Sequence, residues 1–303
     1  MTRFRLAVNA GFAVNRFPEP EAWLGIVGGR LGVRYAQFVA DLLNPFLPAA
    51  VIEAQVGKIR AAAERFGVTI DSAFTSAFTR VNHVLHPDPQ VREAWVRWYE
   101  DLLRLAARLG ARGAGGHFGI LSVRDFEDPA RRERMMAEGI RNWQRLAGLA
   151  RDLGMQFLMI EPMSVPREPP ATIRDTHNLL ARLNDGAAVP IRVCLDVDHG
   201  DPRSPDLRDT DPYAWLREFG AVSPVVHIKQ SKPDKGGHWP FTDEHNREGI
   251  IQGEKVLDAL RASGAEEVAL ALEVSHRERY PWEDRVLDDL KASVEYWRRY
   301  VAE

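Results

Sequence analysis

Eight short β-rich runs recur along this chain, and each is followed by a longer segment with the period of an amphipathic helix. The strands are expected at residues 4–9, 34–41, 68–74, 112–118, 156–161, 191–196, 224–229 and 267–273. Several helical segments close with a glycine, as a left-handed C-cap requires. A strand followed by a helix, eight times over, predicts an α/β fold of the (β/α)8 TIM barrel type.

Nothing in the sequence divides this pattern into two parts. The chain has 303 residues, a length that such barrels commonly take as one domain, and it contains no linker or low-complexity stretch. We therefore expect residues 1–303 to form a single domain. The alternative is a doubly wound open sheet, which would place a glycine-rich dinucleotide loop after the first strand. The segment "NAGFAVNRFPEP" at that position lacks the required spacing.

Charge, hydropathy and cysteine content exclude several classes of protein. The formal net charge of -3 gives no electrostatic reason to expect nucleic acid as a partner. No uncharged apolar run reaches about 18 residues, so we expect no membrane association and a cytoplasmic protein. Cys194 is the single cysteine, which rules out an internal disulfide and a thiolate zinc cluster. We expect it to be a small buried side chain.

Polar residues stand at the ends of four predicted strands. Glu161 ends the fifth strand, Asp196 ends the sixth, His227 lies near the end of the seventh and Glu273 ends the eighth. In a (β/α)8 barrel these ends meet at one rim. Each residue alone is explained by a hydrogen-bonded strand end, but three carboxylates brought together repel unless a divalent cation holds them charged. The oxygen-rich set favours one Mn²⁺, Mg²⁺ or Co²⁺ ion, with Zn²⁺ as a further option.

The same residues carry a resemblance to a known family. The order of Glu161, "DVDH" (196–199), "HIK" (227–229) and "EVSH" (273–276) resembles the xylose isomerase-like barrels, a superfamily of sugar and sugar-phosphate isomerases and epimerases. The loop "HIKQSKPDKGGHWPFTDEHN" is most similar to tetrulose-phosphate epimerases of erythritol catabolism. The resemblance implies that Glu161, Asp196, His227 and Glu273 bind the metal, as in ketose 3-epimerases.

The resemblance also implies a reaction. A proton would move on the carbon beside the carbonyl of a small ketose or ketose phosphate, through an enediolate, with Glu161 and Glu273 as the acid/base pair. Return of the proton to the same carbon gives epimerisation, and return to the neighbouring carbon gives isomerisation. The sequence leaves both outcomes open.

Three residues near the rim are expected to contact the substrate. His199 begins the loop after the sixth strand, and the resemblance implies a hydrogen bond from it to a substrate oxygen. His117 follows two glycines at a strand end, where the backbone can approach a ligand closely. Glu168 lies seven residues after Glu161, near the position of a glutamate that binds sugar hydroxyls in related epimerases.

The loop after the seventh strand concentrates positive charge. It holds Lys229, Lys232 and Lys235, three of only six lysines in the chain, and such loops often bind phosphate. Pro233 stands where neutral-sugar epimerases commonly have an arginine, so a phosphorylated substrate is expected. Trp239 offers an apolar cap for a sugar face. The complete set of expected substrate-binding residues is His117, Glu168, His199, Lys229, Lys232, Lys235, Trp239 and His245.

Other functions fit part of the pattern. A dehydratase acting on a cyclic polyol would use nearly the same barrel and metal, and a catalytically silent barrel could bind sugar alone. Endonuclease IV, a three-zinc phosphodiesterase, belongs to the same superfamily, and His117, His199, Asp243 and His245 partly match its pattern. The third predicted strand offers no histidine where that enzyme has one. Association into homo-oligomers is left open.

Overall fold

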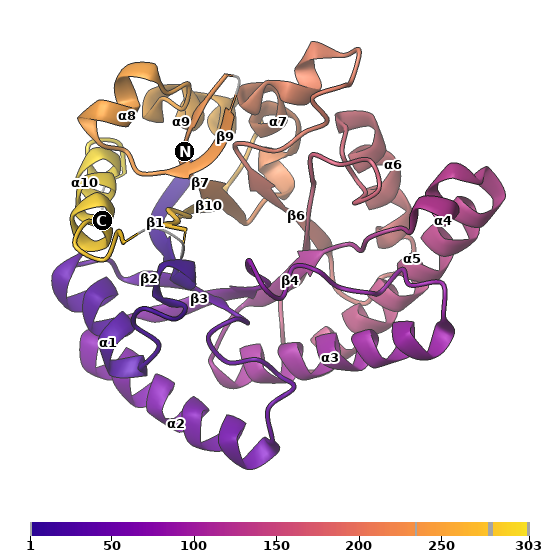
Figure 1. Cartoon of the computed structure of the whole chain (residues 1–303), viewed down its shortest axis with the longest axis horizontal. Coiled ribbons are helices and arrows are strands. Elements are labelled where there is room, and N and C mark those ends of the chain that lie inside the picture. Colours follow the sequence, from indigo (N-terminus) through magenta and orange to yellow (C-terminus); the bar gives the residue numbers. More distant parts are fainter. Residues whose placement is uncertain (1, 234, 278–280, 302–303) are drawn as a thin grey trace.

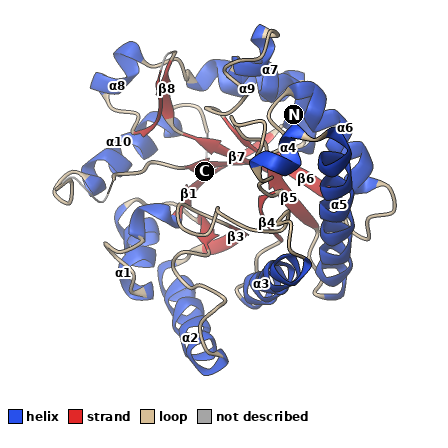
Figure 2. Cartoon of the chain, turned by 45° about the vertical axis from the view of Figure 1, so that its right-hand side comes forward, coloured by secondary structure: helices blue, strands red, loops and turns tan. Residues whose placement is uncertain are grey.

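Eight parallel strands close into a barrel in the order β1, β10, β7, β6, β5, β4, β3 and β2. The computed structural model of the chain describes residues 2–233, 235–277 and 281–301. The helices surround the strands, as Figures 1 and 2 show. The barrel strands are β1 (Arg3–Asn9), β2 (Tyr35–Val39), β3 (Thr69–Phe74), β4 (Gly113–His117), β5 (Phe157–Glu161), β6 (Ile191–Asp196), β7 (Val225–Ile228) and β10 (Glu267–Leu272).

Each predicted strand overlaps one of these eight, so the predicted (β/α)8 barrel is confirmed. The helices are α1 (Pro20–Leu24), α2 (Ala49–Phe66), α3 (Pro89–Arg108), α4 (Val123–Glu127), α5 (Pro129–Asp152), α6 (Ile173–Asn184), α7 (Pro212–Phe219), α8 (Asp243–Glu248), α9 (Gly253–Ala262) and α10 (Val286–Arg298). Within the described ranges, no helix has the length and apolar character needed to cross a bilayer.

The lysine-rich segment after β7 folds into a hairpin that the strand pattern did not predict. Strands β8 (Gln230–Lys232) and β9 (Lys235–Trp239) pair in antiparallel fashion. The hairpin is tied to the barrel mouth, because Gly237 N donates to Asp198 Oδ2 at 3.0 Å and Ser275 N donates to the His238 carbonyl at 3.0 Å. These anchors come from loops far away in the sequence, so periodicity within the segment could not reveal them.

Two apolar layers hold the barrel. The larger lies between the strands and the surrounding helices, and the smaller fills the interior of the barrel with Phe74, Phe157 and Met159 among its members. Cys194 is buried in this inner layer, as expected for a small hydrophobic side chain. Both layers follow from the alternation of side chains along a strand, which directs successive residues to opposite faces.

Strand β4 brings two rim residues together through a close backbone approach. The strand reads GAGGH, so most of its residues are glycine. A Cβ atom at Gly115 would lie 2.0 Å from the carbonyl oxygen of Met159 on β5. The register of this strand pair sets His117 beside Glu161. The glycine therefore fixes how near these two side chains can lie.

Candidate metal and sugar site

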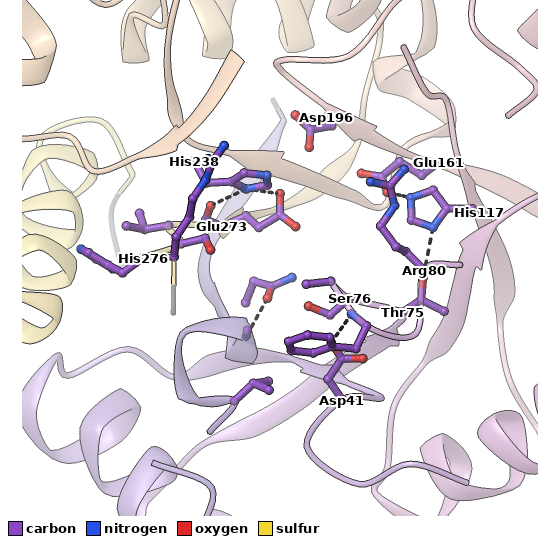
Figure 3. Close-up of a pocket in the computed structure, with 18 of the residues that line it drawn as sticks. Asp41, Thr75, Ser76, Arg80, His117, Glu161, Asp196, His238, Glu273 and His276 are labelled. Atoms are coloured by element: carbon purple, nitrogen blue, oxygen red, sulfur yellow. Dashed lines mark hydrogen bonds and ion pairs between the residues drawn. The ribbon is translucent and has the colours of Figure 1, made fainter. Parts of the chain in front are cut away.

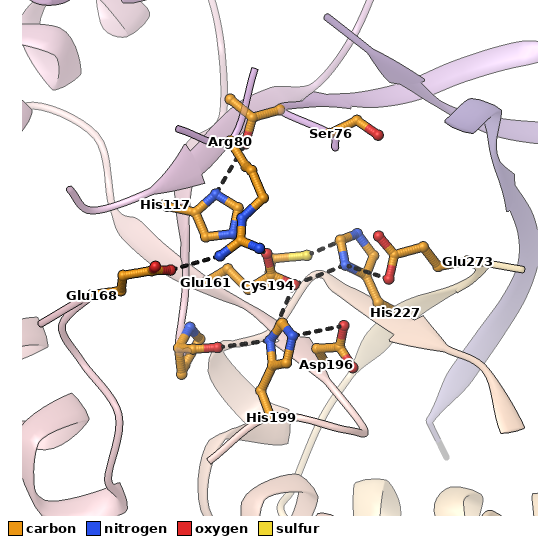
Figure 4. A network of polar contacts seen from close by, with 12 residues as sticks. Ser76, Arg80, His117, Glu161, Glu168, Cys194, Asp196, His199, His227 and Glu273 are labelled. Carbon is orange, nitrogen blue, oxygen red and sulfur yellow. Dashed lines mark hydrogen bonds and ion pairs between the residues drawn. The ribbon is translucent and has the colours of Figure 1, made fainter. Parts of the chain in front are cut away.

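Three buried side chains converge at the C-terminal end of the barrel. Glu161 ends β5, Asp196 ends β6 and His227 lies on β7, and one ligand atom from each lies within 4.8 Å of the others. The Nδ1 atom of His227 is 3.0 Å from Glu161 Oε1 (Figure 4). Two carboxylates and an imidazole nitrogen form an oxygen-rich donor set of the kind that Mn²⁺ or Mg²⁺ takes in proteins. The residues therefore fit a divalent cation.

Glu273 lies just beyond β10 at the edge of this group. Its Oε2 atom is 3.8 Å from His227 Nδ1. Between Glu273 and Asp196 lies the ammonium of Lys229, which is 2.9 Å from Glu273 Oε2 and 2.5 Å from Asp196 Oδ2. Lys229 is fully buried. Its charge is thus shared by two carboxylates of the site, and the ammonium is not the mobile phosphate ligand that the sequence suggested.

The electrostatic balance of the site keeps its two glutamates ionised. Burial alone would raise the pKa of Glu161, but His227 and a hydrogen bond from His117 hold that pKa well below its usual range. Burial would likewise raise the pKa of Glu273, and Lys229 with His227 holds it well below the usual value. Burial would lower the pKa of His227, and the facing carboxylates raise it well above normal.

Two more histidines surround Glu161. His117, at the end of β4, is buried with Nε2 3.2 Å from Glu161 Oε2 and Nδ1 3.4 Å from Thr75 Oγ1. His199 follows β6, and its Nδ1 lies 3.0 Å from the carbonyl oxygen of Pro162. That carbonyl can only accept, so His199 Nδ1 carries a proton and Nε2 faces Asp196 at 3.6 Å.

A cavity of about 520 Å³ opens above these residues (Figure 3). This volume suits a small sugar or sugar phosphate. His117, Glu161, Asp196, His199 and Glu273 all line it, so the structure gathers five of the predicted site residues around one space.

The remaining predicted residues lie elsewhere. Lys232 is paired with Glu248 and lies over the Trp239 ring, with Nζ 5.3 Å from its centroid. Trp239 stacks on His245, whose Nδ1 is 2.8 Å from Thr242 Oγ1. The described side chains that line the cavity do not include Lys229, Lys232, Trp239 or His245. Lys235 belongs to β9, but its side chain lies outside the described residues.

Glu168 contacts the cavity through a partner. Its Oε2 atom accepts from Arg80 Nη2 at 2.7 Å, and Arg80 lines the cavity (Figure 4). The endonuclease pattern is not assembled, because Asp243 and His245 lie on α8 and do not join the group of three. In the part of the chain that the structure describes, no second metal group of this kind is found.

Sequence reasoning missed several residues of the site. Arg80, Thr75 and Ser76 line the cavity from the segment after β3. Asn9 ends β1 and also lines the cavity, whereas Gln37 lies on β2 and contacts His227. A polar residue at the end of an apolar strand was the available signal for Asn9, as it was for Glu161.

The sequence and the barrel both have relatives among known proteins. Residues 30–299 match the family described as xylose isomerase-like TIM barrel. D-erythrulose 1-phosphate 3-epimerase of Brucella abortus (strain 2308) is 37% identical over 297 residues, which cover 98% of this chain and 96% of that protein. A solved structure from Rhodospirillum rubrum ATCC 11170, provisionally named a xylose isomerase, gives a TM-score of 0.89 at 26% identity and covers 99% of this chain and 100% of that one. D-psicose 3-epimerase from Clostridium cellulolyticum H10 shares the fold, with a TM-score of 0.70 at 16% identity and 99% of each chain covered.

Proposed function

Because this chain belongs to the xylose isomerase-like TIM barrel family, we propose that it is a divalent-metal-dependent 3-epimerase of a small ketose phosphate. D-erythrulose 1-phosphate is the first substrate to test, since the Brucella abortus relative is named for it. The observation that carries the proposal is the placement of two glutamates around one imidazole. His227 Nδ1 lies 3.0 Å from Glu161 and 3.8 Å from Glu273, and the two carboxylates flank the ring in Figure 4.

This arrangement supports proton transfer on the carbon beside a carbonyl. Both glutamates are ionised at neutral pH because their pKa values are held well below the usual range. One glutamate takes the proton from carbon 3, and the electron pair moves toward the carbonyl oxygen. The opposing glutamate takes up a proton from solvent and delivers it to the other face of the same carbon. Asp196 and His227 with the two glutamates would hold a divalent cation, which when bound would polarise the carbonyl and stabilise the enediolate charge.

Histidine side chains above the site would orient the substrate. His199 presents Nε2 toward the cavity because its Nδ1 proton is committed to Pro162. His117 holds Glu161 from the other side. We propose that His199 binds a substrate oxygen and that His117 keeps the Glu161 carboxylate in position for proton transfer.

The phosphate group would bind at Arg80 rather than at the lysine-rich hairpin. Arg80 lines the cavity and extends over His117 and Glu161 in Figure 4. Its Nη2 donates to Glu168, and 39% of the side chain is exposed. A guanidinium that is open to the cavity suits a phosphate oxygen. Lys229 is committed to Asp196 and Glu273, and Lys232 is committed to Glu248.

Solvent deuterium tests the reaction directly. Purified protein with Mn²⁺ should convert D-erythrulose 1-phosphate to its carbon-3 epimer in D2O and leave one deuterium at carbon 3, which NMR detects. Glu161→Gln and Glu273→Gln should each abolish net conversion, whereas Glu53→Gln, an exposed change on α2, should leave it intact. Conversion without deuterium incorporation would contradict the mechanism. Deuterium at carbon 2, with the carbonyl moved to carbon 3, would indicate isomerisation instead.

A further inference from the structure

Three buried polar side chains are linked in a row by hydrogen bonds, and the row ends at the proposed metal ligand His227. Its other two members take no direct part in the proposed reaction. Asn9 ends β1, Gln37 lies beside it on β2, and His227 faces them from β7. Their exposed fractions are 3%, 1% and 1%. Burial of an amide costs free energy unless its donors and acceptors are matched by hydrogen-bond partners. The partners of these two amides therefore show what the amides do.

A backbone N–H group sets the orientation of the first amide in this row of hydrogen bonds. Gly11 N lies 2.8 Å from Asn9 Oδ1, and a backbone N–H can only donate, so this end of the Asn9 amide is its oxygen. The NH2 end of Asn9 must then face Gln37, where Nδ2 lies 2.7 Å from Gln37 Oε1. Gln37 therefore presents its carbonyl oxygen to the space between the three side chains.

The same oxygen decides which nitrogen of His227 carries a proton. Gln37 Oε1 is 2.7 Å from His227 Nε2, and a carbonyl oxygen can only accept. Nε2 must carry a proton, since a lone pair there would face the lone pairs of Gln37 in a buried site. The Cys194 sulfur, 3.4 Å from Nε2, is a weak acceptor and agrees with this assignment. Nδ1 faces the Glu161 carboxylate at 3.0 Å, so in the metal-free protein it carries a second proton, which a bound cation would replace.

This orientation is unfavourable for the NH2 group of Gln37. Its Nε2 atom is buried and has no hydrogen-bond partner among the described residues, which is unfavourable for a polar group. A reversed amide would set its NH2 group against the NH2 of Asn9. The unmatched nitrogen thus shows that Asn9 imposes the orientation of Gln37.

We propose that Asn9 and Gln37 are positioning residues that fix the tautomer of His227, so that the lone pair of Nδ1 is the one offered to a divalent cation. The inference rests on the metal site proposed above. Outer partners of this kind typically change metal affinity by about 10- to 100-fold when they are removed. Asn9 lines the cavity, but within the described residues its hydrogen bonds go to Gln37 and Gly11, so its effect on the His227 ring passes through Gln37.

Asn9→Asp tests the direction of this row of hydrogen bonds with almost no change of shape. The new carboxylate would still accept from Gly11 N, but its second oxygen would face Gln37 and require the Gln37 amide to reverse. The reversed NH2 would then donate to His227 Nε2 and leave the ring with a proton only on Nδ1. We expect Mn²⁺ affinity, measured by electron paramagnetic resonance or calorimetry, to fall by about 10- to 100-fold. Simple electrostatics predicts the opposite, because a new negative charge near the site attracts a cation.

A second readout needs neither metal nor substrate. In metal-free protein labelled with ¹⁵N-histidine, NMR should find a proton on His227 Nε2 in wild type, whereas in Asn9→Asp the ring should carry a proton only on Nδ1. Asn44→Asp is the matched control, because Asn44 Oδ1 accepts from both Trp98 Nε1 and Phe46 N and an aspartate keeps both bonds. The control should retain wild-type metal affinity and the wild-type tautomer.

Gln37→Met guards against a variant that simply misfolds. It removes the acceptor while keeping the length of the side chain, and it should also weaken Mn²⁺ binding by about 10- to 100-fold in a protein with a native circular dichroism spectrum. Unchanged or tighter Mn²⁺ binding in both variants, or an unchanged His227 tautomer in Asn9→Asp, overturns the inference. A wild-type protein that shows the tautomer and metal effects but does not epimerise the candidate substrate refutes the proposed function alone.

Discussion

Lys229 places a buried positive charge inside the set of metal ligands. Its ammonium is hydrogen-bonded to Asp196 and Glu273, and His238 ring nitrogens lie 3.3 Å and 3.5 Å away. Burial would lower the pKa of Lys229, but the two carboxylates raise it above its ordinary value. In the metal-free protein this charge offsets the repulsion between two carboxylates, and it opposes the arrival of a second cation.

Lys229→Met should therefore tighten Mn²⁺ binding. Repulsion between a unit charge and a divalent charge a few ångströms apart amounts to several kcal/mol even at an effective dielectric constant of about 20. Relaxation reduces this figure, so we expect an increase in affinity of roughly 10-fold or more, measured by calorimetry. Lys232→Met is the matched control, because Lys232 pairs with Glu248 outside the cavity. Weaker binding in Lys229→Met would show that the ammonium organises the ligands instead of competing with the cation.

Arg80→Met should selectively impair the phosphorylated substrate. Loss of one charge-assisted hydrogen bond costs about 1.5–3 kcal/mol, which corresponds to a rise in KM of roughly 10- to 150-fold. The free tetrulose should be nearly unaffected, and kcat/KM for both sugars gives the comparison. Lys232→Met should leave both values unchanged. Equal losses on the two sugars for Arg80→Met would remove Arg80 from the phosphate site.

Strand β4 depends on glycine for its distance from β5. At Gly115, a methyl group would lie 2.0 Å from the Met159 carbonyl oxygen, so the strands would have to separate beside His117 and Glu161. Gly115→Ala should lower the free energy of unfolding by about 1–3 kcal/mol or more, as overpacked cores do. Urea denaturation measures this loss.

Gly148 on α5 provides the opposite case for the same substitution. A Cβ atom there would have nothing within 4 Å, so Gly148→Ala should raise the free energy of unfolding by about 0.4–1 kcal/mol. If Gly115→Ala is as stable as Gly148→Ala, the close approach of β4 and β5 does not limit the barrel.

Metal binding should stabilise the whole barrel, because the ligands Glu161, Asp196 and His227 come from three adjacent strands. A cation at 100 times its Kd adds about 2.7 kcal/mol if it binds only the folded state. Mn²⁺ should raise Tm by several degrees in a thermal melt, and a chelator should reverse the shift. Asp196→Asn should lose most of it. Asp211→Asn, which keeps the N-cap of α7, should retain it. An equal shift in both variants would place the cation elsewhere.

Local patterns in the sequence are enough to predict the barrel and the position of its rim. Strand and helix periods are local properties, and so are signals such as Asp88-Pro89 and Asp128-Pro129, where the aspartate caps the first turns of α3 and α5. Once eight parallel strands close, their C-terminal ends must meet, which brought together Glu161, Asp196 and His227 as predicted.

Which side chains contact these three residues depends on how the whole chain folds. Gln37 meets His227 across 190 residues of sequence, Lys229 turns inward to Asp196 and Glu273, and Arg80 crosses to Glu168 from a different loop. The sequence does not reveal that Lys232 pairs with Glu248 or that Asp198 anchors the hairpin at Gly237. The lysines of this segment were therefore expected to be available for phosphate. Ion pairs and hydrogen bonds depend on distances of a few ångströms between strands, and no periodic pattern encodes those distances.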